Sequence, residues 1–387
     1  MTKKASTPAL RFKGFTYTWK QRKLSDQFSD FIVPMRDKPK KFGGNIPWTR
    51  IEDIEGKYLN GSLSGQFVSK DTIKQMNLKI IPKDSLIVSS SATFGVVAII
   101  TQDLITNQTF IGLVPNDKET LDFWYTFFHS NEARNYMRLQ SAGSTIFYIA
   151  REHFEKMPII IPFKDEMITI GKYFSNLDRL ITLHQRKYDK LTNMKKSMLE
   201  KMFPNNGANV PEIRFKGFTD AWEQRKLKEV VNVYDGVHQT PDYKDSGVMF
   251  LSVENISILK SEKYISEEAF QKDYKVYPQK GDVLMTRIGD VGTPNVVETT
   301  EKVAFYVSLA LLKPTKINSY FLCNSIQSPL FQKGLKDRTL VTAIPQKINK
   351  DEIGKVNIIL PASSQEQQLI GEYFRNLDRL ITLHQRE

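Results

Sequence analysis

Residue types that could perform catalysis are few and scattered in this sequence. Asp53, Glu55 and Lys57 are the carboxylates and the lysine that a Mg²⁺-dependent nuclease gathers around its metal, but they form only a short local coincidence. Residues 289–292 (Gly-Asp-Val-Gly) have the glycines of a phosphate-binding loop without its lysine, so a turn is the better interpretation. Methylation of adenine needs an Asn/Asp-Pro-Pro-aromatic loop around the flipped base, and Pro-Pro does not occur in the chain. The sequence therefore predicts a chain that is not itself an enzyme.

Polar and basic loops offer a different chemistry, which is the recognition of duplex DNA through its base edges and phosphates. In the first half of the chain the candidates for DNA contact are Arg36, Lys38, Lys40, Lys41, Trp48, Arg50, Ser89, Ser90, Ser91, Thr93, Ser141, Ser144 and Thr145. In the second half they are His238, Gln239, Thr240, Thr286, Arg287, Lys336, Arg338, Thr339, Thr342 and Gln346. The net charge of +12, from 55 Lys and Arg against 43 Asp and Glu, favours a polyanion as partner. A solvated loop is the alternative interpretation of each segment.

Metal and disulfide chemistry are not predicted. The five histidines are too widely spaced for a metal site, and the one cysteine, Cys323, can form neither an internal disulfide nor a CxxC metal site. A single cysteine fits a reducing compartment, and the sequence shows neither a secretory leader nor an apolar stretch of membrane-spanning length. We therefore expect a cytoplasmic protein without a metal or a cofactor of its own.

The most informative feature of the sequence is an internal repeat. Residues 8–24 return as residues 211–227 with 12 of 17 positions identical, and residues 171–187 return as residues 371–387 with 14 of 17 identical. The intervening segments, 25–145 and 228–340, are similar in length but align only loosely. Near-identical ends around dissimilar middles indicate one scaffold that is presented twice to the same kind of partner. The two dissimilar interiors would each recognise a different target.

The two interiors have the pattern of mixed α/β structure. Short β-branched and aromatic runs, such as residues 86–88 and 248–251, are separated by Gly, Pro, Asn and Asp. Residues 119–139 and 318–335 favour helices, the second interrupted at Pro329. The expected fold class is therefore α/β (mixed α+β), with two globular domains.

A long helix is predicted from Lys164 to Phe203, because apolar residues recur at alternating steps of four and three without an internal proline. The seam positions of this heptad are Ile170, Phe174, Leu177, Ile181, His184, Tyr188, Leu191, Met198 and Met202. The second copy carries Ile370, Phe374, Leu377, Ile381 and His384 and stops at Glu387, about sixteen residues early. The two histidines hold equivalent positions, where a polar residue in the seam helps to fix register.

An apolar helix face needs a packing partner that covers it, and the other copy of the same helix is the obvious candidate. We expect the two helices to form an antiparallel coiled coil with one globular domain at each end and an internal pseudo-two-fold axis. The expected domains are residues 1–163, the first helix 164–203, residues 204–361 and the short second helix 362–387.

The order of these motifs resembles that of the specificity subunits of type I DNA restriction-modification systems. The resemblance rests on Arg11–Leu24 and Arg214–Leu227 (RFKGF…W…RKL), on Gly281–Arg287 (GDVLMTR), and on the pattern Pro361…Glu366-Gln367…Leu377-Asp378, and it covers essentially the whole chain. It implies two target-recognition domains that each read half of a bipartite double-stranded DNA site. It also implies that the helices act as a ruler between the half-sites.

The resemblance further implies partners. The helices would dock two modification (adenine methyltransferase) subunits and, through them, the restriction (motor and nuclease) subunits. S-adenosylmethionine, ATP and Mg are then expected on those partners, with no cofactor in this chain. The alternatives are a self-contained DNA methyltransferase or nuclease, and a non-enzymatic DNA-binding scaffold protein.

Overall fold

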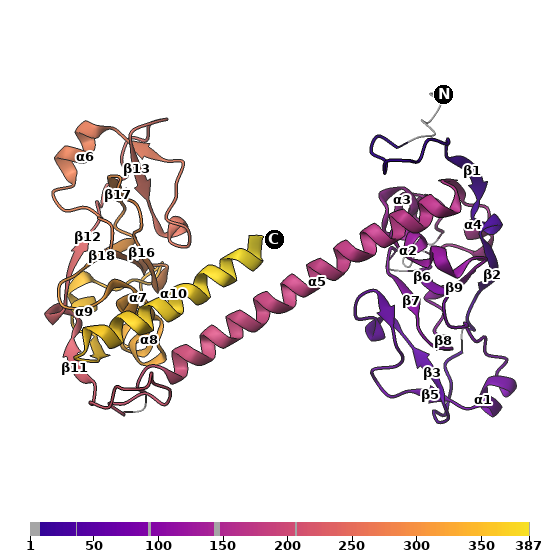
Figure 1. Cartoon of the computed structure of the whole chain (residues 1–387), viewed down its shortest axis with the longest axis horizontal. Helices are drawn as coiled ribbons and strands as arrows, with labels where there is room; N and C mark the ends of the chain where they lie inside the picture. Colours follow the sequence, from indigo (N-terminus) through magenta and orange to yellow (C-terminus); the bar gives the residue numbers. More distant parts are fainter. Residues whose placement is uncertain (1–7, 36, 92–93, 143–147, 206, 387) are drawn as a thin grey trace. The chain divides into compact units, whose positions relative to one another are not determined.

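The structure is a computed structural model that describes residues 8–35, 37–91, 94–142, 148–205 and 207–386. The chain divides into two compact units, unit 1 (residues 1–181) and unit 2 (residues 182–387). Figure 1 shows short sheets and helices in each unit and one long helix, α5 (Lys164–Lys201), whose residues belong to both. The predicted mixed α/β class is confirmed. Within the described part of the chain, none of the helices combines the length and the apolarity needed to cross a bilayer.

Unit 1 is built on a five-stranded sheet with the order β2-β9-β6-β7-β4. Its strands are β2 (Phe28–Ile32), β4 (Tyr58–Leu59), β6 (Leu86–Ser89), β7 (Val97–Ile100) and β9 (Phe110–Pro115). A three-stranded sheet contains β5 (Phe67–Val68), β3 (Ile46–Thr49) and β8 (Ile105–Thr106), and a two-stranded sheet pairs β1 (Lys20–Lys23) with β10 (Pro158–Ile161). The helices before α5 are α1 (Lys70–Gln75), α2 (Leu121–His129), α3 (Asn131–Leu139) and α4 (Arg151–Glu155), and the 3-10 turns are η1 (Leu24–Asp26), η2 (Ile51–Asp53) and η3 (Lys118–Thr120).

The segment 119–139, predicted as one helix, is two helices, because Ser130 ends one and begins the next. Its hydroxyl accepts a hydrogen bond from the backbone N–H of Ala133 at 3.2 Å, which makes it the N-cap of α3. Phe123, Trp124 and Phe128 of α2 are buried in the core cluster against strands of the five-stranded sheet. The hydrophobic pattern therefore predicted the helical content correctly and missed the break.

Unit 2 repeats this architecture. Its four-stranded sheet has the order β12-β18-β15-β16, which corresponds strand by strand to β2-β9-β6-β7. Its strands are β11 (Glu223–Lys226), β12 (Val231–Asp235), β13 (Val248–Leu251), β14 (Tyr264–Ile265), β15 (Val283–Ile288), β16 (Asp290–Val296), β17 (Val303–Phe305), β18 (Leu309–Pro314) and β19 (Asn357–Leu360). The helices are α6 (Glu267–Asp273), α7 (Ser319–Gln327), α8 (Pro329–Lys336), α9 (Lys350–Gly354) and α10 (Ser364–Arg386), with turns η4 (Leu227–Glu229) and η5 (Val253–Asn255). The interiors that align only loosely in sequence thus share one topology.

Pro329 interrupts the second predicted helix, as expected. It occupies the first turn of α8, where a residue without an N–H costs no hydrogen bond, and Ser328 separates it from α7. Each break between paired helices lies at an equivalent point of the two units, at Ser130 and at Ser328.

The repeated ends of the sequence close each unit in the same way. Strand β1 pairs with β10, and β11 pairs with β19 in the same antiparallel register. In unit 1, the Arg11 guanidinium donates to both carboxylate oxygens of Glu166, at 2.7 and 2.6 Å. In unit 2, Arg214 donates to both oxygens of Glu366 in the same manner, at 2.7 and 2.9 Å. Both glutamates are buried in the first turn of their helices, so a bidentate ion pair attaches each opening motif to its helix.

Helix α10 packs antiparallel against the part of α5 that belongs to unit 2. His184 faces His384 with 3.2 Å between their Nδ1 atoms, Lys195 pairs with Asp378 at 2.6 Å, and the ring of Phe203 lies 6.0 Å from that of Phe374. As the residue number rises along α5 and on to Phe203, just after its end, the number of the partner falls along α10, which defines the antiparallel direction. The predicted antiparallel pairing of the two helix copies is confirmed.

The predicted seam residues fall into two groups. In unit 2, Leu191, Met202, Ile370, Phe374 and Leu377 are buried in one core cluster, Met198 and Ile381 pack against it, and Tyr188 is half-buried. In unit 1, Ile170 packs on the core, Leu177 is half-buried, and Phe174 and Ile181 are exposed. A seam role for these last two residues stays a prediction.

Candidate nucleic-acid interface

In unit 1, several of the predicted DNA-contacting loops meet along one edge. The backbone N–H of Asn107 donates to the carbonyl of Thr49 at 3.2 Å, and Ser90 N–H donates to the carbonyl of Thr109 at 2.8 Å. The N–H of Ile149 in turn donates to the Ser90 carbonyl at 2.8 Å. The end of β3, the loop after β6, the turn between β8 and β9 and residues 148–149 are therefore neighbours. We call this set of segments the unit 1 loop edge.

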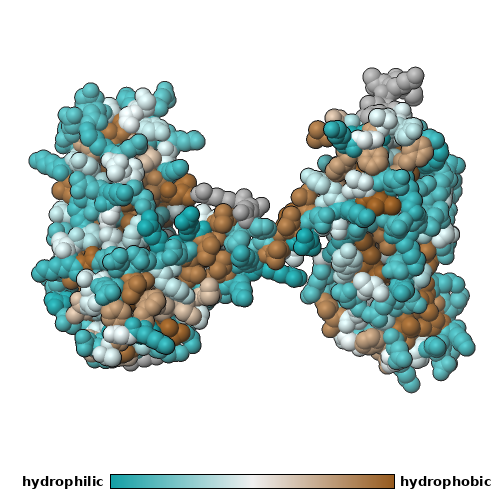
Figure 2. Space-filling model, in the orientation of Figure 1, coloured by the Kyte–Doolittle hydropathy of each residue, from teal (hydrophilic) through white to brown (hydrophobic). Residues whose placement is uncertain are grey.

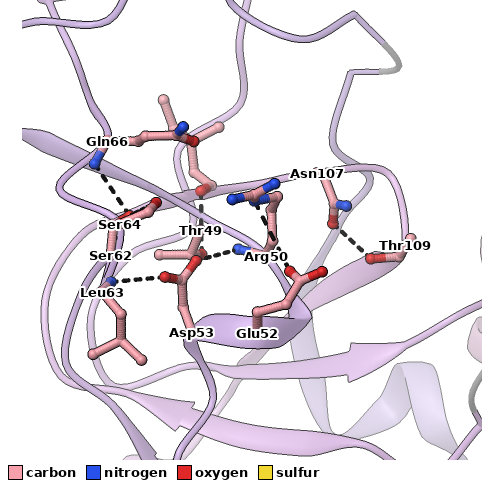
Figure 3. Close-up of polar contacts among 11 residues, drawn as sticks. Thr49, Arg50, Glu52, Asp53, Ser62, Leu63, Ser64, Gln66, Asn107 and Thr109 are labelled. Atoms are coloured by element: carbon pink, nitrogen blue, oxygen red, sulfur yellow. Dashed lines mark hydrogen bonds and ion pairs between the residues drawn. The ribbon is translucent and has the colours of Figure 1, made fainter.

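Arg50 stands at the end of β3 on a turn that is held by a buried carboxylate (Figure 3). Asp53 accepts from the backbone N–H of Arg50 and from that of Leu63, both at 2.7 Å. The Arg50 side chain lies 3.9 Å from Glu52 and 5.7 Å from the ring of Trp48, and remains partly exposed. This turn presents a guanidinium at the loop edge, and both oxygens of the Asp53 carboxylate accept backbone hydrogen bonds within it.

The lysine of the apparent nuclease cluster has different contacts from Asp53. Lys57 pairs with Asp122 in the first turn of α2 at 2.6 Å and donates to the hydroxyl of Ser175 on α5 at 2.9 Å. Asp53 and Lys57 therefore belong to separate structural contacts. Within the parts of the chain that the structure describes, no group of three or more His, Cys, Asp or Glu residues is placed to hold a metal ion.

A cluster of aromatic rings and cations lies beside Arg50. The ring of Phe42 is 5.6 Å from that of the buried Trp48, and Lys38 Nζ lies 5.6 and 5.8 Å from these two ring centres. Stacking of this kind holds a basic side chain in a defined direction while leaving its charge available. Three of the predicted residues, Lys38, Trp48 and Arg50, are thus brought together, and Phe42 was missed by the sequence analysis.

Unit 2 has an equivalent edge. The N–H of Gly289 donates to the carbonyl of Gln346 at 2.8 Å, and the Gln346 side chain donates back to the Gly289 carbonyl at 3.0 Å. Ile348 N–H donates to the carbonyl of Arg287 at 3.0 Å, and Val237 exchanges backbone hydrogen bonds with the segment 305–307. The segments 235–241, 286–290 and 338–348 therefore form the unit 2 loop edge. On it His238, Gln239 and Thr240 are exposed.

Arg287 is the buried centre of the unit 2 loop edge. Its guanidinium pairs with Asp235 and donates to the carbonyl of Ile348 at 3.0 Å, so it connects β12, β15 and the segment before α9. Thr286 donates to Asp290 at 3.1 Å. Both side chains are almost completely buried, so they position the loops in the described structure. The partner of Arg287 lies 52 residues away in sequence, and no local signal could have revealed it.

The pairing of basic side chains differs between β3 of unit 1 and the three-stranded sheet β14-β13-β17 of unit 2. In unit 2, Lys263 donates to Glu254 at 2.7 Å, and this hydrogen bond holds the pKa of the Glu254 carboxyl below its ordinary value and that of Lys263 above. The charge of this lysine is therefore largely neutralised beside Tyr243, 5.6 Å away. In unit 1, Arg50 has the looser contact with Glu52 described above. Of these two cations, Arg50 is therefore the less tightly paired, with 3.9 Å to its carboxylate against 2.7 Å for Lys263.

The structure places the predicted DNA-contacting residues in four groups. Exposed are Lys38, Lys40, Lys41, His238, Gln239, Thr240, Lys336, Thr342 and Gln346. Partly exposed are Arg50, Ser90, Ser91, Ser141, Arg338 and Thr339. Trp48, Ser89, Thr286 and Arg287 are buried, so direct contact of these four with DNA would require their surroundings to move and stays a prediction. Arg36, Thr93, Ser144 and Thr145 lie outside the described residues.

Sequence reasoning missed several exposed or edge residues. Asn107 and Thr109 occupy the turn between β8 and β9, where the Thr109 hydroxyl donates to the Asn107 side chain at 2.6 Å. The sequence Asn-Gln-Thr between two apolar runs is a turn signal that could have identified them. Val341 and Ile344 are exposed on the unit 2 loop edge. Their apolar side chains do not match the polar and basic types from which DNA contacts are predicted.

A second kind of surface repeats on the two helices. Leu180 and Leu183 of α5 have 42% and 52% of their surface exposed, and Leu380 and Leu383 of α10 have 43% and 48%. Residues three apart share one helix face, so each helix carries a leucine strip, here named after its helix. Figure 2 shows apolar surface along the helices. The α10 strip adjoins a hollow that is lined also by Asn376, Arg379 and Thr382.

Comparison with known proteins gives a consistent result. The sequence model of the type I restriction modification DNA specificity domain matches the chain twice, over residues 18–193 and 219–387. The specificity subunit of the type I restriction enzyme MjaVIII from Methanocaldococcus jannaschii is 23% identical over 379 residues, which cover 92% of this chain and 88% of that protein. The specificity subunit of MjaIX from the same organism is 23% identical over 273 residues, 67% of this chain and 63% of that protein.

A solved structure resembles the fold as well. The crystal structure of the S subunit of a type I restriction-modification system from M. genitalium superimposes with a TM-score of 0.59 at 16% sequence identity. The superposition covers 98% of this chain and 94% of that one.

Proposed function

The chain belongs to the family of type I restriction modification DNA specificity proteins, with two specificity domains, and we propose that it selects the DNA sequence on which a restriction-modification complex acts. Each loop edge would bind one half of a bipartite double-stranded site. The observation that carries this proposal is one topology built twice around two chemically different loop edges. Unit 1 presents Lys38, Arg50 and the aromatic rings beside them, whereas unit 2 presents the 238–240 loop and the 338–348 segment.

Charge supports double-stranded DNA as the ligand of both edges. Exposed lysines lie on or next to each edge, at positions 38, 40 and 41 in unit 1 and at 333, 336 and 347 in unit 2. Such lysines neutralise phosphates and make binding depend strongly on salt, while hydroxyl, amide and imidazole groups between them can read base edges. An unmodified duplex of unrelated sequence should therefore bind weakly, and with a salt dependence like that of the specific site.

The leucine strips support docking of two copies of one partner. Of the 17 positions in the repeated helix segment, 14 are identical, and the leucines in them are similarly exposed in both copies. Two equivalent apolar surfaces on one chain suit two identical protein subunits. The family proposal assigns them to two modification (adenine methyltransferase) subunits, through which the restriction subunits would join.

The chain itself would be non-catalytic. Both oxygens of Asp53 accept backbone hydrogen bonds, and Lys57 is committed to Asp122 and Ser175, so these residues serve the fold. S-adenosylmethionine, ATP and Mg²⁺ would be bound by the partner subunits, and the assembly would work in the cytoplasm, where the DNA of the cell is reached. Membership of this family does not favour a self-contained methyltransferase, nuclease or plain scaffold.

The test uses cells that express the full chain together with the modification subunits. Sequencing of methylated bases should reveal a bipartite motif that depends on this gene. Exchange of residues 228–340 for the corresponding segment of another family member should change one half of the motif and leave the other half unchanged. A change of both halves together would contradict independent reading by the two units. Binding of S-adenosylmethionine by the isolated chain in calorimetry would contradict the non-catalytic role.

A further inference from the structure

The loop between α8 and α9 carries an apolar tip on the otherwise polar unit 2 loop edge. Ile344 is 100% exposed and Val341 is 66% exposed, at positions surrounded by hydroxyl, amide and lysine side chains. Single exposed apolar residues are common, but two exposed aliphatic side chains three residues apart on one hydrogen-bonded loop favour a contact with an apolar group of a ligand.

The tip stands on a firmly held base. Leu340 N–H donates to the carbonyl of Lys347 at 2.8 Å, which closes the loop, and Gln346 and Ile348 are hydrogen-bonded to β15 and the turn after it, as described above. Ile348 is completely buried. A loop that is already ordered loses little conformational entropy when it binds, so its apolar tip can contribute to affinity at low cost.

The surroundings of the tip identify the ligand as an anion that also displays apolar groups. A surface hollow beside the loop is lined by Lys333 and Lys336 together with Thr339, Val341 and Gln346. Lys347 at the base of the loop is exposed as well. Duplex DNA meets both requirements, because its phosphates attract the lysines and the thymine C5-methyl group is the apolar feature of its major groove.

We propose that Val341 and Ile344 contact thymine methyl groups in the half-site that unit 2 reads. This inference rests on the proposed function, in which the unit 2 loop edge binds duplex DNA. The two aliphatic side chains would cover the methyl group while the lysines hold the flanking phosphates. The loop would therefore contribute sequence information, and not only general affinity for DNA.

The experiment uses the full chain assembled with its modification subunits. The ligand is a duplex that contains the bipartite motif identified by sequencing of methylated bases. Each thymine of the unit 2 half-site is replaced in turn by deoxyuridine, which removes only the methyl group. Loss of one buried methyl corresponds to about 0.8 kcal/mol, so one of these replacements should weaken binding of the unaltered complex about four-fold. The V341A/I344A variant should bind the thymine duplex correspondingly more weakly and should be insensitive to the same replacement. V276A, which shortens an exposed aliphatic side chain between α6 and β15, is the control and should behave like the unaltered complex.

Other outcomes separate the inference from the function on which it rests. An unchanged affinity of V341A/I344A overturns the inference. Weaker binding of the variant with a full deoxyuridine effect also overturns it, because the tip would then contact DNA in another way, such as insertion between base pairs. Failure of the unaltered complex to bind its motif would instead refute the proposed function.

Discussion

Removing one leucine strip should remove one partner subunit. The perturbation is the pair L180A/L183A on α5, or the matched pair L380A/L383A on α10. Alanine preserves helix propensity, and these side chains are about half exposed, so the helices should remain folded. The two pairs occupy identical sequence positions of the repeat, which makes each the control for the other.

The magnitude follows from the exposed surface of the leucines. Complete burial of a leucine side chain is worth about 2 kcal/mol, and close to half of each side chain is still exposed in the free chain. Covering the remainder contributes about 1 kcal/mol per leucine and about 2 kcal/mol per strip, which corresponds to about a 30-fold change in Kd. At a partner concentration ten times the Kd of the unaltered chain, one of the two docking positions should then be mostly empty.

Native mass spectrometry of the chain titrated with modification subunits measures this directly. The unaltered chain should bind two partner subunits, each double variant one, and the quadruple variant none. L139A, which shortens a leucine that is 80% exposed at the end of α3, should bind two. If either double variant keeps both partners at the affinity of the unaltered chain, the leucine strips are not the docking surfaces. Equal weakening of both positions by one pair would show that the two surfaces do not act separately.

Three further predictions concern the helices and the cysteine. F374A should lower the free energy of unfolding of unit 2 by about 3 kcal/mol in urea denaturation, because this ring is completely buried. F174A, at the matched and exposed position, should lower the free energy of unfolding by less than about 1 kcal/mol. Equal losses of stability would contradict the packing described for α10. Desolvation raises the pKa of the Cys323 thiol to about 12. The protonated thiol therefore contributes to folding stability at pH values below the ordinary cysteine pKa, and this contribution is lost as the pH rises towards 12. At pH 9 iodoacetamide should therefore alkylate the folded chain at least about ten-fold more slowly than the urea-unfolded chain, and similar rates would contradict the raised pKa of this partly exposed thiol. A heptad inserted between Thr192 and Lys195 should lengthen the spacer of the methylated motif by up to about three base pairs, while an insertion of two residues should prevent assembly; an unchanged spacer with the heptad would mean that the helices do not set the distance.

The duplicated plan of the molecule could be predicted because its ends are nearly identical in sequence. Comparison of residues 171–187 with 371–387 predicted two equivalent helices, and their apolar seam predicted the pairing that His184 and His384 show. The common topology of the interiors could not be predicted. Buried strand positions in β6 and β15 accept different apolar residues without a change of fold, so sequence identity is lost while strand order is kept.

The candidate interface was predictable at the level of loops and not of side chains. The polar and basic loops could be selected from their composition, but their meeting along one edge of each unit and the direction of each side chain depend on partners far away in the sequence. Arg287 was chosen as a DNA contact and is buried against Asp235, and Ser89 donates to the carbonyl of Ser91 at 2.9 Å. Ile344 was not chosen, because an apolar residue on a loop has no distinguishing local pattern.

The two leucine strips and the two loop edges differ in which amino-acid substitutions they can accept during evolution. If both strips bind the same partner, a substitution in one strip that suits an altered partner leaves the other strip mismatched, so the two copies can change only in concert. The loop edges carry no such constraint, because each faces its own stretch of DNA. One edge can drift, or be replaced as a block, while the other edge and both strips are retained. Selection on this chain should therefore generate new target sequences readily and new partners rarely.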